Sequence, residues 1–172
     1  MYALETERTF LTLLTENDLP DMEALAREED TFKYLKFLQV MSPQEYTQFL
    51  HTKLEQIRTG AGYHWAARSK KDGQFIGAVN LNPIRGTSRL QIGAQLKRDY
   101  WSQGFASELL QRLVEFGIHE LHLPAVYGVF EKENSASRRL LEKLGFVFEK
   151  SFQEKEVEVE VYKYTAPGSH PV

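Results

Sequence analysis

The sequence predicts an α/β (α+β) domain in which a mixed central β-sheet is flanked by helices. Three observations predict it. Segments with the apolar alternation of strands are interspersed with segments that carry the apolar period of helices. Strands joined as hairpins recur towards both ends, and no repeat, low-complexity tract or linker interrupts the chain. These features predict a single domain over residues 1–165 and a disordered tail over residues 166–172.

Composition places the chain among ordinary globular proteins. Its 172 residues are 42% hydrophobic and 26% charged, with a formal net charge of -3, which argues against a dedicated nucleic-acid or anionic-membrane binder. The absence of cysteine excludes disulfides, a thiolate nucleophile and a cysteine-type zinc site. No signal peptide is recognisable, and no apolar run reaches the roughly 18 residues of a membrane span. We therefore expect a cytoplasmic protein.

The expected elements alternate along the chain. A strand is expected where apolar and polar residues alternate, and a helix where apolar residues recur at every third or fourth position. In chain order they are a strand at 7–14, helices at 15–28, 30–38 and 42–57, a hairpin at 63–81, a strand at 88–96, a helix after Gly104, a strand at 125–130, a helix at 134–144, and strands near 146–150 and at 154–165.

Two of the helix starts carry capping residues. Asn17 or Asp18 is the expected cap of the first helix, because either side chain can accept a hydrogen bond from a free backbone N–H group. The helix at 42–57 has the stronger signal. Ser42 and Glu45 match a capping box, and Pro43 suits the first turn.

The last strand alternates glutamate with valine, which places Glu156, Glu158 and Glu160 on one face. Two interpretations remain open for this acidic face. It is either the solvated face of an edge strand that is protected from aggregation, or a surface that attracts a cationic amine or a basic peptide N-terminus.

The stretch 98–116 combines an aromatic pair, a bend of small residues and a strongly helical second half. Gly104 and Ala106 stand where that helix begins. A helix start leaves backbone N–H groups unpaired and carries partial positive charge, so small residues there favour an approaching anion such as a pyrophosphate. The alternative is that Gly104 only permits a tight turn between strand and helix.

A second segment, 133–146, gives independent information. Asn134 stands at a helix start, Ser137 lies one turn into the helix, and Gly145 follows the helix end. Taken alone, Asn134 would be an N-cap and Ser137 a tolerated first-turn serine. The two segments in this order, about thirty residues apart, resemble the GNAT superfamily of acyl-CoA-dependent N-acyltransferases. The Tyr-Trp pair before the glycine turn and the start of the chain resemble its RimJ/RimL-like branch, which acetylates ribosomal-protein N-termini.

This resemblance covers nearly the whole chain and implies the GNAT acyl-CoA N-acyltransferase fold. It implies that backbone amides at the helix start hold the coenzyme A pyrophosphate, and that the preceding strand pairs with the pantetheine and thioester. The implied coenzyme contacts are Ile92, Gly93, Ala94, Gln95, Leu96, Gln103, Gly104, Phe105, Ala106, Ser107, Asn134 and Ser137. Ser137 is also expected to protonate the departing thiolate, with Asn134 binding the pantetheine or its neighbouring backbone.

The acceptor side is less defined by the resemblance. An amine must lose a proton, and Glu131 is the preferred base, with His64, Glu29, Asp30 or a water chain as alternatives. Phe32 and the aromatic residues Tyr34, Tyr63, Trp65 and Tyr100 are the expected acceptor contacts, although such side chains more often belong to a core. His119 and His122 are expected at a helix end, in contact with solvent. The chemistry requires no metal.

Some positions depart from the pattern of the branch. Gln91 stands where glutamate is common, Ala94 where an aromatic residue is common, and Lys132 where proline is common. The broader superfamily often has arginine or glutamine at Trp101, a departure that the branch shares. The first three positions lie near the acceptor, so they bear on the identity of the substrate.

The resemblance implies an acetyl-CoA-dependent N-acetyltransferase that transfers acetyl directly to a primary amine, either a protein N-terminal amine or a small amine. Acetyl-CoA is the expected cosubstrate, no nucleic-acid or membrane partner is expected, and a homodimer is left open. The alternative from another functional class is a non-catalytic acyl-CoA-binding or regulatory module on the same fold.

Overall fold

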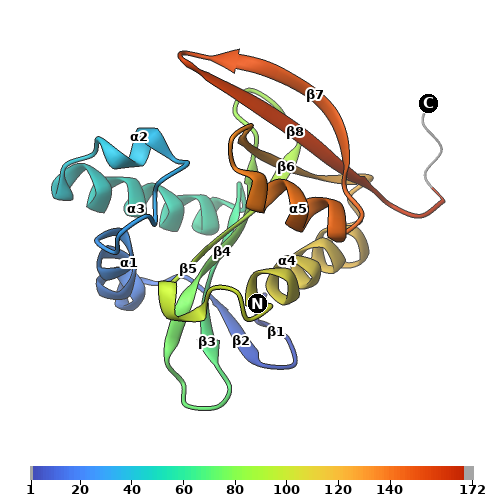
Figure 1. The fold of residues 1–172 in the computed structure, drawn as a ribbon. Helices are drawn as coiled ribbons and strands as arrows, with labels where there is room; N and C mark the ends of the chain where they lie inside the picture. Colours follow the sequence, from blue (N-terminus) through green and yellow to red (C-terminus); the bar gives the residue numbers. More distant parts are fainter. Residues whose placement is uncertain (1, 169–172) are drawn as a thin grey trace.

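The computed structural model describes residues 2–168, and its centre is an eight-stranded sheet in the order β1-β2-β3-β4-β5-β6-β8-β7 (Figure 1). The strands are β1 (Leu4–Glu5), β2 (Thr9–Leu13), β3 (Tyr63–Ser69), β4 (Phe75–Pro83), β5 (Leu90–Leu96), β6 (Ala125–Glu131), β7 (Val147–Glu154) and β8 (Val157–Thr165). The α-helices are α1 (Leu19–Ala26), α2 (Lys36–Gln39), α3 (Pro43–Thr59), α4 (Phe105–Glu115) and α5 (Ser135–Lys143). Two short 3-10 helices, η1 (Glu16–Asp18) and η2 (Arg98–Tyr100), and a π-helical segment, η3 (Phe116–Glu120), which directly follows α4, complete the helical elements. The expected mixed sheet flanked by helices is confirmed.

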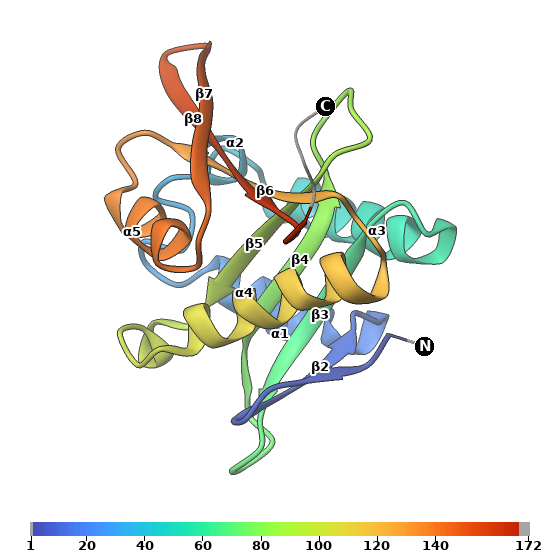
Figure 2. The ribbon, with the colours of Figure 1, turned by 90° about the vertical axis from the view of Figure 1, so that its right-hand side faces the viewer.

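The helices are divided between the two faces of the sheet. The segment from α1 to α3 lies on one face, and α4 and α5 lie on the other (Figures 1 and 2). The alternation of β3 shows how the sequence divides the core. Trp65 and Ala67 pack in the cluster that includes Leu109 and Leu113 of α4, whereas Ala66 packs in the cluster that includes Leu50 of α3. None of the helices between residues 2 and 168 has the length and apolar character that a membrane crossing needs.

One strand pair differs from all the others. β5 and β6 run parallel, whereas the other neighbouring strands are antiparallel. The antiparallel partner β4 pairs with β5 along its whole length, from Leu90 to Leu96. The parallel partner β6 meets β5 at a single register pair, Gln91 with Tyr127. The two strands therefore separate beyond Gln91.

The helix starts confirm one capping prediction in full and the other in position only. Ser42 and Glu45 form the expected capping box, in which the Glu45 N–H donates to Ser42 Oγ at 3.2 Å. The first helical segment instead begins after Thr15, as turn η1. Asp18 occupies the N-cap position of α1, one of the two positions expected, but its side chain makes no capping hydrogen bond to that helix. Its carboxylate instead accepts the Thr15 N–H at 2.9 Å, within the capping box of η1. The helix expected at 30–38 is limited to the four residues of α2, after a series of turns.

The alternating glutamates of β8 lie in a different environment from the one expected for an edge strand. β7 forms the edge of the sheet and β8 lies inside it, so the edge-strand interpretation is wrong. Glu160 is 8% exposed and accepts Arg138 Nη2 of α5 at 3.1 Å, and Glu158 accepts Lys132 Nζ at 2.9 Å. These carboxylates lie on the α5 side and are already paired. The expected tail begins at residue 166, and residues 169–172 lie outside the described part of the chain.

Close packing of β4 on β5 yields the first testable prediction. A Cβ atom on Gly77 would overlap the Gln95 carbonyl oxygen and lie 2.8 Å from Leu96 Cα. Because backbone atoms of a central strand cannot move aside cheaply, we expect Gly77→Ala to destabilise the fold by about 1–3 kcal/mol in chemical denaturation. Gly86→Ala, at a turn glycine with φ +76 and open space around it, is the control with the smaller expected loss. Equal losses in both variants would contradict the close packing.

Candidate functional site

The separation of β5 from β6 leaves a free strand edge in the middle of the sheet. Beyond the Gln91–Tyr127 pair, residues 92–96 have no strand partner on the β6 side within the described chain. Backbone N–H and C=O groups need hydrogen-bond partners, so an extended ligand with amide groups can pair with this edge as an added strand would. The five coenzyme contacts expected on this strand, Ile92, Gly93, Ala94, Gln95 and Leu96, all lie along the free edge.

The start of α4 lies where the chain continues from β5 through η2. Gly104 is the N-cap of α4, in the left-handed conformation with φ 82 and ψ 2. The first intrahelical hydrogen bond of α4 runs from the Glu108 N–H to the Gly104 carbonyl at 3.1 Å. The N–H groups of Phe105, Ala106 and Ser107 therefore have no intrahelical partner, and they form a site that favours an anion. Trp101 fixes the loop, because its Nε1 donates to the Leu96 carbonyl at 2.9 Å.

Arg8 ties the loop before α4 to the first hairpin. Its Nη1 donates to the Gln103 carbonyl at 3.0 Å, its Nε donates to Glu108 Oε1 at 2.8 Å, and its Cζ lies 3.8 Å above the Phe105 ring. Burial would raise the pKa of Glu108, but hydrogen bonds from Thr6 and Arg8 outweigh it and hold the pKa below its ordinary value. The positive charge of Arg8 thus offsets the negative charge of the Glu108 carboxylate, which would otherwise repel an anion at this helix start. No motif in the sequence pointed to Arg8.

The start of α5 stands just beyond the end of β6. Asn134 Oδ1 accepts the Ser137 N–H at 3.1 Å, so Asn134 is the N-cap of α5. Ser137 is half-buried, and its hydroxyl makes no hydrogen bond within residues 2–168. A hydroxyl without a protein partner is available to a ligand. Asn134 and Ser137 are thereby held one turn apart on a rigid element.

Glu131 ends β6 on the face of the sheet that α3 covers. Its strand neighbours two and four residues earlier, Val129 and Tyr127, pack in a small cluster on that face. Tyr127 pairs with Gln91, so the side chains of Glu131 and Gln91 lie on the same face of the sheet, on the two sides of the separation. A carboxylate there could reach an amine that approaches from the α3 side.

The expected acceptor aromatics fall into two groups. Trp65 is fully buried, its Nε1 donates to the Tyr2 carbonyl at 2.7 Å, and Tyr63 stacks on it with ring centroids 5.9 Å apart. Both belong to the core beneath α4, which gives no support to the acceptor role expected of them. Tyr100 packs edge-on against Phe105 beside the anion-favouring helix start. Tyr34 is half-buried in the connection between α1 and α2.

The structure also separates the alternatives for the base. His64 is 2% exposed, and its Nε2 lies 2.7 Å from Gln56 Oε1. Burial and the nearby charge of Lys53 lower the pKa of His64 to about 3, so this imidazole stays neutral near pH 7 and is not a base for an ammonium group. Glu29 and Asp30 are exposed in the connection that follows α1. His119 and His122 are exposed at the helix end, as expected.

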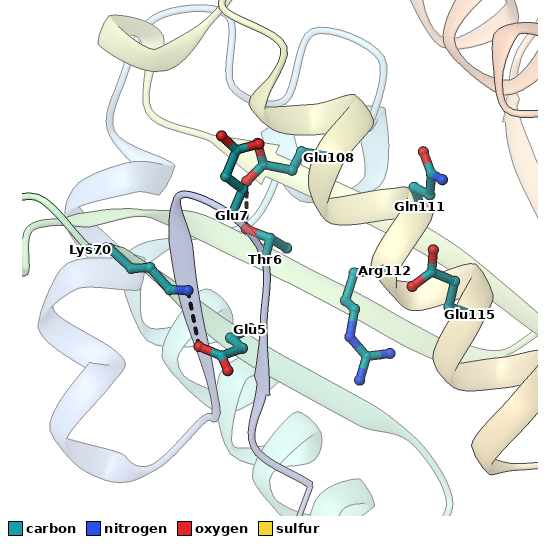
Figure 3. A pocket seen from close by; sticks show the side chains of 8 residues that line it. All are labelled: Glu5, Thr6, Glu7, Lys70, Glu108, Gln111, Arg112 and Glu115. Carbon is teal, nitrogen blue, oxygen red and sulfur yellow. Dashed lines mark hydrogen bonds and ion pairs between the residues drawn. The ribbon is translucent and has the colours of Figure 1, made fainter.

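Two hollows lie away from the free edge of β5. One is an open depression between the β1–β2 turn and α4, at the β1 end of the sheet (Figure 3). Its lining residues are Glu5, Thr6, Glu7, Lys70, Glu108, Gln111, Arg112 and Glu115. The other lies between α1, α2 and the start of α3, with Phe32 and Tyr46 in its lining. Among residues 2–168 no group of three or more metal-ligating side chains is present.

Replacement of His64 tests its buried neutral state. Its folded pKa of about 3 lies below the ordinary 6.5, so between these values the unfolded chain binds more protons and acid destabilises the fold. We expect the melting temperature to fall between about pH 7 and about pH 5, and His64→Gln to reduce that fall. His51→Gln, at an exposed position of α3, is the control. The same pH dependence of the melting temperature in His64→Gln and in the wild type would contradict the buried, neutral state of the His64 imidazole.

Comparisons with known proteins identify the family and the fold. The chain matches the family model described as an acetyltransferase (GNAT) domain over residues 8–147. It is 26% identical over 144 residues to "Uncharacterized N-acetyltransferase YoaA" of Bacillus subtilis (strain 168), covering 83% of this chain and 81% of that protein. It shares its fold with RimL, a ribosomal L7/L12 alpha-N-protein acetyltransferase solved with coenzyme A, at a TM-score of 0.83 and 17% identity over 98% of this chain and 100% of that chain. It also shares the fold of spermidine N-acetyltransferase from Vibrio cholerae, at a TM-score of 0.76 and 20% identity over 91% and 95% of the two chains. Because the family model spans most of the chain, the protein belongs to the GNAT acetyltransferase family.

Proposed function

We propose that the protein is an acetyl-CoA-dependent N-acetyltransferase that transfers acetyl directly to a primary amine. The observation that carries this proposal is the free edge of β5 next to the unpaired N–H groups at the start of α4. One feature suits the amide-containing pantetheine and the other suits the pyrophosphate, and the chain runs directly from one to the other. RimL, which shares the fold, was solved with coenzyme A, which supports the same ligand here.

The proposed binding mode assigns a task to each segment. The N–H groups from Gln103 to Ser107 receive the pyrophosphate, and the edge of β5 from Ile92 to Leu96 pairs with the pantetheine. The thioester then lies near Gly93, where β5 and β6 begin to separate. Asn134 holds the start of α5 against the coenzyme, and the free hydroxyl of Ser137 faces the sulfur.

The reaction proceeds by direct attack. The neutral amine nitrogen forms a bond to the thioester carbonyl carbon, and a backbone N–H between Ile92 and Ala94 stabilises the resulting oxyanion. The C–S bond then breaks, and Ser137 supplies the proton that the departing thiolate takes up. The amine loses its own proton to Glu131, directly or through water. Holding both reactants in one cleft supplies several kcal/mol of the rate enhancement.

The acceptor is a protein N-terminal amine or a small amine. RimL acts on a ribosomal protein and the Vibrio cholerae enzyme on spermidine, so both acceptor classes occur on this fold. The runner-up function is a non-catalytic acyl-CoA-binding or regulatory module. A free-thiol assay with a panel of amines separates the two, because such a module would be stabilised by acetyl-CoA without releasing thiol.

Gly104 tests the coenzyme site. The free energy of unfolding should rise by roughly 2–3 kcal/mol at a hundredfold excess of acetyl-CoA over its dissociation constant. Gly104→Val should abolish the rise, because φ +82 is disfavoured for a branched residue and its Cβ, 3.5 Å from Arg8 Nη2, would crowd the proposed anion site. Gly86→Val, a turn glycine with φ +76 away from α4, controls for the backbone cost. A full ligand-induced shift in a folded Gly104→Val would place the anion site elsewhere.

The Ser137→Ala variant tests whether Ser137 protonates the departing thiolate. Ser137→Ala should retain acetyl-CoA binding and lower kcat by roughly ten- to a thousandfold, because the leaving group loses its proton donor. Ser135→Ala, at an exposed position of the same helix start, is the matched control. Thiol release at the wild-type rate in Ser137→Ala would reduce Ser137 to a structural residue of α5.

A further inference from the structure

A polar row crosses the α3 side of the sheet and ends at the free edge of β5. The register pairs His64 of β3 with Asn80 of β4, and Asn80 with Gly93 of β5. Ala66 and Ala78, two residues away on the same strands, pack in the cluster that includes residues of α1 and α3. His64, Asn80 and Gly93 therefore face the same side. We refer to these three residues as the polar row.

Gly93 leaves room for the Asn80 side chain. A Cβ atom on Gly93 would lie 3.0 Å from both Asn80 Nδ2 and Asn80 Oδ1. The carboxamide of Asn80 thus lies directly over the backbone of Gly93, where the thioester is proposed to bind. Asn80 is half-buried, and its carboxamide makes no hydrogen bond to any group between residues 2 and 168. An amide in this position is open to a ligand that enters from the α3 side.

His64 presents an unpartnered hydrogen-bond acceptor beside Asn80 on the neighbouring strand. Its Nε2 lies 2.7 Å from Gln56 Oε1, which only accepts, so Nε2 carries the proton and Nδ1 presents a lone pair. His64 Nδ1 is a buried side-chain atom without a hydrogen-bond partner in the described chain. Its neighbour in the row is Asn80, and cross-strand partners have Cβ atoms roughly 5 Å apart. An Nδ2–H of Asn80 turned towards Nδ1 would satisfy it and direct Oδ1 towards the cleft.

We propose that Asn80 is a substrate-binding residue whose Oδ1 accepts a hydrogen bond from the attacking amine, with His64 and Gln56 as positioning residues behind it. This inference rests on the proposed function and adds an acceptor contact to it. A neutral carboxamide oxygen binds an amine N–H while the nitrogen lone pair points at the carbonyl carbon.

The test begins with the wild type. Free-thiol release from acetyl-CoA is measured with spermidine, tyramine and short peptides that begin with serine, alanine or methionine, and kcat and KM are determined for the best acceptor. Asn80→Ala should lower kcat/KM for that acceptor by roughly tenfold, the value of one hydrogen bond, and leave the KM for acetyl-CoA within about twofold. Asn82→Ala is the matched control, since Asn82 is also half-buried on β4 but pairs with Gln91.

The positioning role has a separate readout. Gln56→Leu removes the partner of His64 Nε2, so the tautomer is no longer fixed and kcat/KM should fall by about threefold to fivefold. In the Asn80→Ala background the same change should have no further effect on kcat/KM. Additive losses would reduce Gln56 to a merely structural residue and overturn its positioning role.

The outcomes separate this inference from the function on which it rests. An Asn80→Ala protein that folds, binds acetyl-CoA and acetylates the acceptor with unchanged kcat/KM overturns the acceptor contact and leaves the transferase function intact. A wild type that acetyl-CoA stabilises but that releases thiol with none of the amines overturns the transferase function, and the acceptor contact with it. An equal loss in Asn82→Ala and Asn80→Ala overturns the specific role of Asn80.

Discussion

The site depends on the failure of one strand pair to continue. β5 is held along its full length by β4, so its conformation is fixed by the sheet, while β6 leaves it after the Gln91–Tyr127 pair. A rigid strand with one unpaired edge is rare inside a sheet, because unpaired backbone groups cost free energy unless something binds them. β8 completes the other side of β6 from Ala125 to Glu131, so the separation is confined to one place.

The elements around this edge are fixed by core packing and by a few polar contacts. α4 buries Leu109 and Leu113 completely, which sets the position of its N-terminus relative to β5. Arg8 then joins the first hairpin to the loop through Gln103, and Trp101 joins the same loop to the end of β5. The anion-favouring helix start and the free strand edge are therefore parts of one rigid frame, which lowers the entropic cost of binding a long, flexible ligand.

Local signals in the sequence predicted local structure well. The Ser42 capping box and the left-handed turn at Gly104 follow from residues within one turn, and the GNAT resemblance correctly indicated the fold. Which face a side chain occupies depends on partners far along the chain. Trp65 proved to be a core residue because its strand lies over α4, and Glu160 proved to be paired because α5 brings Arg138 to it. The contacts of Arg8 and Asn80 join residues from separate elements, so no local pattern could reveal them.

Amide hydrogen exchange with and without coenzyme A tests the central claim most directly. If the coenzyme pairs with the free edge of β5 and binds at the start of α4, protection should increase at amides among residues 92–96 and 103–107. The hollow between the β1–β2 turn and α4 should show no change at Glu5 or Lys70. Unchanged exchange along residues 92–96, with new protection in that hollow instead, would contradict the account.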